Sequence, residues 1–144
     1  MWLVLFLSLL IIRQEKTELL YKPTLGSVNL RVMDDVTIRA RNLKDNEIMI
    51  VIVRLGKGEN PKLDAYRLQQ FRSFLSYQRK LPLERFIFAQ GETTDNYGRV
   101  EFYVDGKLFV TLAADKNLGI PLCCDCIDDS SFTPSFIRKS RHKR

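Results

Sequence analysis

The spacing of apolar residues predicts two helices in the middle of the chain. Over residues 32–44, apolar side chains recur at steps of three and four, at Met33, Val36, Ala40 and Leu43. Residues 61–79 carry a second stripe of the same kind, with Asn60 as the expected N-cap and Pro61 at the first helical position. Because Pro82 cannot continue a helix, the second helix should end before it.

Five other apolar segments predict strands. Residues 47–55 contain the run IMIVIV, and a run without alternation is typical of a central strand covered on both faces. A short strand is expected before it, at residues 27–30. Three more follow, at residues 85–90, 99–104 and 107–112. The last two are separated only by Asp105 and Gly106, a pair that favours a tight hairpin.

The predicted elements begin in the order βαβαβ and end in a hairpin, which extends the βαβαββ order by one strand. They describe a small α+β domain in which two helices pack on one face of a mixed sheet. With 144 residues and 45% hydrophobic content, the chain has room for one core. We expect the domain to occupy residues 21–114. An apolar segment and spacer, residues 1–20, precede it, and a cysteine-containing loop and basic tail, residues 115–144, follow it.

The apolar run WLVLFLSLLII at residues 2–12 has the length of the hydrophobic part of a secretion signal. As a helix it would span about 16 Å, whereas a bilayer crossing needs about 20 residues. No Lys or Arg precedes the run, and no small-residue cleavage site follows it. We expect export or an uncleaved N-terminal anchor in contact with a membrane. A buried strand or helix of the domain is the alternative.

The net charge of +6 raises the question of nucleic-acid binding. Five positive charges lie in the tail, at Arg138, Lys139, Arg141, Lys143 and Arg144. The rest of the chain therefore carries about +1, which is small for a protein that binds phosphate backbones. An RNA-binding sheet with a basic tail stays an alternative because several aromatic residues lie on predicted strands. These are Phe86, Phe88, Phe102 and Tyr103.

Residues 32–109 resemble the OmpA-like C-terminal domain of bacterial envelope proteins. The resemblance rests on the order of a helix (MDDVTIRARNLKDN), a hydrophobic strand before a glycine-rich loop, a helix (AYRLQQFRSFL), a turn (LPLERFIFAQGE) and a strand (GRVEFYV). It implies a non-enzymatic interaction module that is periplasmic, or membrane-anchored and facing the periplasm. The implied partner is an envelope protein or peptidoglycan.

The resemblance also implies ligand-binding residues. In members that bind peptidoglycan, an Asp after the central strand and an Arg on the next helix hold the carboxylate and the amine of diaminopimelate. Arg67 matches the helix Arg, and Arg54 is a second candidate at the end of the strand. The loop reads RLGKG and contains no Asp, so we expect weak or no peptidoglycan binding. The alternative for Arg67 is an ion pair with Asp64 or Glu84.

Three cysteines, Cys123, Cys124 and Cys126, form a cluster after the predicted domain. Since adjacent cysteines form only a strained ring, a disulfide in an exported protein would join Cys126 to one of its neighbours or link two chains. An inert surface cluster and a thiol-redox or metal role are the alternatives. A zinc site would need a second ligand pair, and the one histidine, His142, lies in the tail.

Motifs for catalysis are missing from the sequence. It contains no serine elbow, no HExxH helix and no phosphate-binding loop. We therefore expect no enzymatic activity, no metal and no cofactor.

Overall fold

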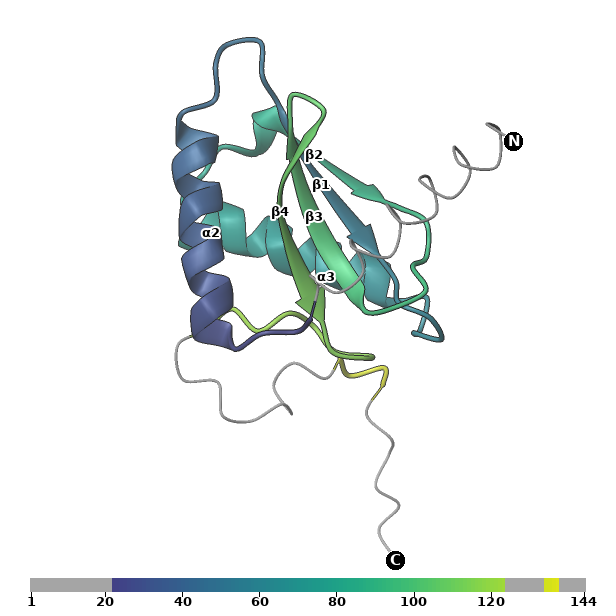
Figure 1. The fold of residues 1–144 in the computed structure, drawn as a ribbon. Helices are drawn as coiled ribbons and strands as arrows, with labels where there is room; N and C mark the ends of the chain where they lie inside the picture. Colours follow the sequence, from purple (N-terminus) through teal and green to yellow (C-terminus); the bar gives the residue numbers. More distant parts are fainter. Residues whose placement is uncertain (1–21, 124–133, 138–144) are drawn as a thin grey trace, which may run out of the picture.

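The computed structural model describes residues 22–123 and 134–137, which form one small mixed sheet with two helices (Figure 1). In chain order, the elements are α2 (Gly26–Arg41), β1 (Met49–Arg54), α3 (Leu63–Ser73) with a π-helical turn η2 (Phe74–Gln78), the 3-10 turn η3 (Leu83–Arg85), β2 (Phe86–Gln90), β3 (Gly98–Val104) and β4 (Lys107–Ala114). The strand order is β2-β1-β3-β4, with β1 parallel to β2 and antiparallel to β3. The predicted α+β class is confirmed.

The strand expected at residues 27–30 is wrong, because these residues lie inside α2. The helix could not be recognised here because Asn29 interrupts the spacing of apolar residues. Asn29 occupies the buried position one turn before Met33, where an amphipathic helix usually has an apolar residue. Its side-chain amide instead donates to the carbonyl oxygens of Thr24 and Pro121, at 3.3 and 2.9 Å. The described elements therefore follow the order αβαβββ, which lacks the first predicted strand.

Both helices cover the same face of the sheet (Figure 1). Met33 of α2 and Phe71 of α3 belong to one core cluster with alternate residues of β1. These are Met49, Val51 and Val53. Phe71 has no exposed surface and meets Phe102 of β3 edge-on, with 5.7 Å between the ring centroids. This agrees with the predicted stripe on the second helix.

The opposite face of β1 differs from the expectation. Ile50 and Ile52 are only half-buried, so β1 alternates between buried and half-buried residues instead of being covered on both faces. The strand is central because it lies between β2 and β3, and the helices seal one side of it. The apolar run therefore predicted the central position of β1 correctly. Its prediction that both faces of the strand are covered was wrong.

The domain continues past residue 114, its predicted C-terminal limit. Ile120 is fully buried in the core cluster, so the segment after β4 packs on the domain.

The predicted hairpin is present between β3 and β4, with positive φ angles of 51° at Asp105 and 70° at Gly106. None of the helices in the described ranges combines the length and apolar character that a bilayer crossing requires. The predicted N-terminal segment lies outside these ranges.

Candidate binding site

Two loops leave the carboxyl ends of the parallel strands β1 and β2 and meet on one edge of the sheet. Ligands of parallel sheets commonly bind at this edge. The Lys57 amide donates to the Asn96 carbonyl at 3.2 Å, and the Thr94 amide donates to the Leu55 carbonyl at 2.8 Å. A Cβ atom on Gly56 would lie 2.5 Å from the Gly98 nitrogen. Glycine is therefore required where the loops touch.

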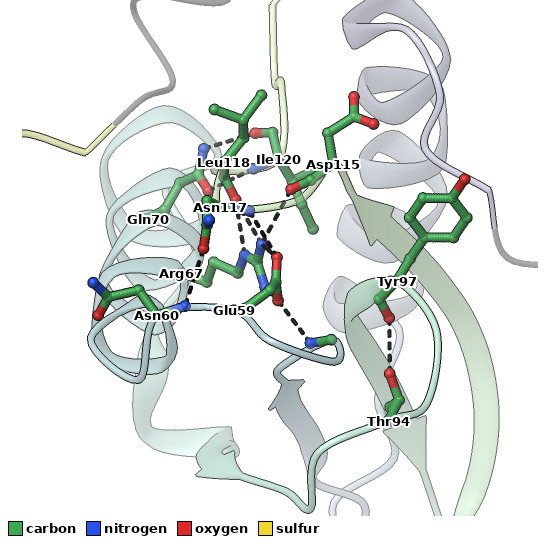
Figure 2. A network of polar contacts seen from close by, with 11 residues as sticks. Glu59, Asn60, Arg67, Gln70, Thr94, Tyr97, Asp115, Asn117, Leu118 and Ile120 are labelled. Carbon is green, nitrogen blue, oxygen red and sulfur yellow. Dashed lines mark hydrogen bonds and ion pairs between the residues drawn. The ribbon is translucent and has the colours of Figure 1, made fainter. Parts of the chain in front are cut away.

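An ion pair between Arg67 and Glu59 lies beneath these loops (Figure 2). Nη1 of Arg67 donates to Oε2 of Glu59 at 2.8 Å, and Nη2 donates to Oε1 at 2.7 Å. The exposed fractions of the two side chains are 0% and 2%. This is the two-pronged geometry that makes arginine–carboxylate pairs strong and directional.

The same pair also forms hydrogen bonds with the segment that follows β4. Nε and Nη2 of Arg67 donate to the Leu118 carbonyl at 3.0 and 2.7 Å. The Glu59 carboxylate accepts from the amides of Gly56 and Asn117, at 2.7 and 3.0 Å. Every nitrogen of the guanidinium and both carboxylate oxygens thus have partners inside the domain (Figure 2).

Electrostatics keep the Glu59 carboxylate ionised. Burial alone would raise the pKa of Glu59, but hydrogen bonds from Arg67 and from the Gly56 amide outweigh burial and lower it below its ordinary value of 4.5. The pair is therefore a charged, desolvated contact. Removing one member of such a pair leaves the other charge buried without compensation.

The structure places Arg67 differently from the sequence-based expectation. Its guanidinium is enclosed and held by Glu59, rather than exposed for a ligand or paired with Asp64 or Glu84. In this arrangement Arg67 positions loops instead of contacting a ligand. The signal in the sequence was Glu59 itself, which lies in the loop after β1 but further from the strand than the position expected for an Asp.

Arg54 lies apart from Arg67, in a cluster on the sheet face opposite the helices. Its Nε donates to Oε2 of Glu101 at 2.9 Å, and Nε of Arg99 donates to Oε1 of the same carboxylate at 2.6 Å. The Tyr103 hydroxyl donates to Oε2 at 2.9 Å. The pKa of Glu101 is lowered because hydrogen bonds from Arg54 and Arg99 outweigh the opposing effect of burial. The two arginines proposed from the sequence therefore do not form one site.

A hollow of about 590 Å³ opens between the loops beside the Glu59–Arg67 pair. Its lining comes from the β1–α3 loop, the β2–β3 loop and the turn after β4, and consists of Lys57, Gly58, Glu59, Asp95, Asn96, Tyr97 and Lys116. We call it the lysine pocket. Gly58 has a φ of 72°, and a Cβ atom there would lie 3.4 Å from Nζ of Lys116. Lys116, Asp95 and Tyr97 could not be identified from the sequence, because only the fold brings them together.

The cysteine cluster is described only in part. Cys123 forms a disulfide bond, while Cys124 and Cys126 lie outside the described residues. Within the described ranges, no three His, Cys, Asp or Glu side chains are placed to hold a metal ion. The lysine pocket is therefore the candidate binding site.

Comparison with protein-family models, with curated proteins and with solved structures finds no match to this chain.

Proposed function

We propose that this protein is a non-enzymatic interaction module of the bacterial envelope that binds a carboxylate group in the lysine pocket. The observation that carries the proposal is the convergence of Lys57 and Lys116, from loops far apart in sequence, on one hollow. Two ammonium groups beside a single exposed acid, Asp95, favour an anionic ligand group. The resemblance to OmpA-like domains and the apolar run at residues 2–12 support the envelope as its compartment.

The contacts around the pocket hold its loops in place, which favours ligand binding. The Glu59–Arg67 pair joins the β1–α3 loop to the turn that carries Lys116, so both lysines stand on a fixed frame. A binding site that is already formed loses less conformational entropy when its ligand arrives. Tyr97, with 38% of its surface exposed, adds an aromatic wall for the body of the ligand.

A second candidate is peptidoglycan, and Asp95 is the observation that favours it. The sequence has no Asp directly after β1, but the β2–β3 loop brings Asp95 to the same pocket. A ligand with a carboxylate and an ammonium, such as diaminopimelate, would place the first on the lysines and the second on Asp95. Because Arg67 is held by Glu59, this geometry differs from the clamp that the resemblance implies.

Calorimetry with the full-length chain in mild detergent tests both candidates. The probes are a short neutral peptide with a free carboxyl terminus, the same peptide with an amidated terminus, and a diaminopimelate-containing muropeptide. We expect the free carboxylate to bind at least about tenfold more tightly than the amide, which corresponds to about 1.4 kcal/mol. Lys57→Ala and Lys116→Ala should remove that preference, and Lys107→Ala, on the distant hairpin, should keep it.

The outcomes separate the candidates. Equal binding of the free and amidated peptides, or a preference that survives both lysine substitutions, contradicts the proposal. Tighter binding of the muropeptide that is lost in Asp95→Asn replaces it with peptidoglycan recognition. Binding of single-stranded RNA by a chain that lacks residues 138–144, weakening as salt rises, would instead revive the RNA-binding alternative.

A further inference from the structure

A groove of about 450 Å³ separates α2 from the edge strand β4, on the side of the domain away from β2. Three residues of α2, the C-cap residue of that helix and two residues of β4 line it, namely Asp35, Ile38, Arg39, Asn42, Phe109 and Val110. Ile38 is 58% exposed and Phe109 is 39% exposed, so large apolar side chains face solvent here. In the described residues, β4 pairs with β3 alone, which leaves its outer edge open to a further strand.

The exposed side of α2 next to this groove has a self-complementary order of residues. Val28, Arg31, Asp35 and Ile38 are all exposed and follow one another at helical steps of three and four. They therefore lie along one side of the helix, in the order apolar, basic, acidic, apolar. Against an antiparallel copy of itself, this stripe places Val28 opposite Ile38 and Arg31 opposite Asp35, each pair occurring twice.

We propose that a second copy of this chain docks on this face, with α2 beside α2 and β4 paired antiparallel to β4. A two-fold axis is the symmetry in which one patch contacts itself and each contact is made twice. Since α2 runs alongside β4 (Figure 1), a single axis relates both pairs. The resulting dimer joins the two sheets into one and covers Ile38 and Phe109.

The complementary charges select a second copy over another partner. The two Arg31–Asp35 contacts form only if the facing helix has the same residues in the opposite direction. A generic extended peptide could occupy the edge of β4, but it would not supply complementary charges opposite Arg31 and Asp35. This interface is separate from the lysine pocket, which lies among the loops at the carboxyl ends of β1 and β2.

Sedimentation of the full-length chain in density-matched detergent tests the inference through charge reversal. Wild-type protein should sediment as a dimer in reversible equilibrium with monomer. Asp35→Arg brings two arginines together at both contacts, and we expect the dimer dissociation constant to rise at least about tenfold at low salt. Glu84→Arg, an exposed reversal in η3 next to β2, is the matched control and should leave the constant unchanged.

The double variant Arg31→Glu with Asp35→Arg restores both pairs with exchanged signs, and it should recover the dimer. Hydrogen exchange provides a second readout, since the backbone amides of β4 should gain protection as protein concentration rises. A chain that stays monomeric at all concentrations overturns the inference and leaves β4 open to another protein's extended segment. A dimer that is indifferent to Asp35→Arg, or not recovered by the double variant, overturns it as well.

Discussion

Arg67 of α3 and Glu59 of the β1–α3 loop hold each other through two hydrogen bonds of 2.8 and 2.7 Å, entirely inside the domain. The guanidinium also binds the Leu118 carbonyl, so one side chain connects three separate segments. A residue expected to contact a ligand is thus a structural support for the loops that form the lysine pocket. Stability and binding are consequently linked through this pair.

Breaking the pair should destabilise the protein strongly. We expect Arg67→Ala to lower the free energy of unfolding by about 3–5 kcal/mol, because Glu59 would stay buried without its counter-charge. Urea unfolding followed by circular dichroism measures the change. Arg72→Ala, an exposed arginine later on the same helix, is the comparison. Similar small losses in both variants would show that the pair contributes little.

A second route to the same pair is through Gly98. A Cβ atom at this position would lie 2.2 Å from Oε2 of Glu59 and 2.3 Å from Nη1 of Arg67. Gly98→Ala should therefore destabilise the fold although it removes no interaction, because the buried ion pair has no room to move. An unchanged unfolding midpoint would mean that the loop gives way without loss.

Stability should fall as the solution is made acidic. The pKa values of Glu59 and Glu101 are lowered in the folded protein, against an ordinary value of 4.5. Their stabilising contribution is therefore complete above that value and is lost as the pH falls through the folded pKa values. Asp64 works in the opposite direction, since burial, with a smaller effect of the Glu59 charge, raises its pKa.

Thermal unfolding between pH 7 and pH 3 measures this dependence. In Glu101→Gln the decline should be shallower than in the wild type, because one of the lowered groups no longer titrates. Glu84→Gln, an exposed carboxylate away from both clusters, should follow the wild-type curve. A Glu101→Gln curve as steep as that of the wild type would contradict this explanation.

A separate prediction concerns the core residue Phe71. Its side chain is fully buried and packs edge-on against Phe102. We expect Phe71→Ala to lower the free energy of unfolding by about 3–5 kcal/mol, the usual range for emptying a buried aromatic site. Tyr77→Ala, at a side chain that is 73% exposed, is the control. A loss below about 1 kcal/mol at Phe71 would contradict its place in the core.

Local patterns predicted the parts of this fold that depend on near neighbours in sequence. The β-branched run marked β1, the apolar stripe marked the helix carrying Phe71, and the Asp105–Gly106 pair marked the hairpin. The N-terminal turns of α2 were missed because Asn29 is buried by contacts with Thr24 and the distant Pro121. Polar residues that are satisfied by remote carbonyls break the pattern on which sequence reasoning relies.

The candidate site was harder to predict for the same reason. Lys116, Asp95 and Lys57 come from three loops and share no local motif. Only the sheet topology brings them together, because β1, β2 and β4 run in the same direction and end at the same side of the sheet. The clamp residue Arg67 was identified by its place on the helix, but its partner depends on how the loop folds back. Burial of a charged side chain can rarely be deduced without knowing what encloses it.

A map of amide chemical shifts during titration tests most directly whether a carboxylate binds in the lysine pocket. The full-length protein in detergent micelles is labelled with nitrogen-15 and titrated with the peptide that has a free carboxyl terminus. We expect shift changes that are concentrated at residues 56–59, 94–97 and 115–118 and that are reduced by Lys57→Ala. Changes centred on Arg54 and Tyr103, or confined to the basic tail, would contradict binding in the lysine pocket.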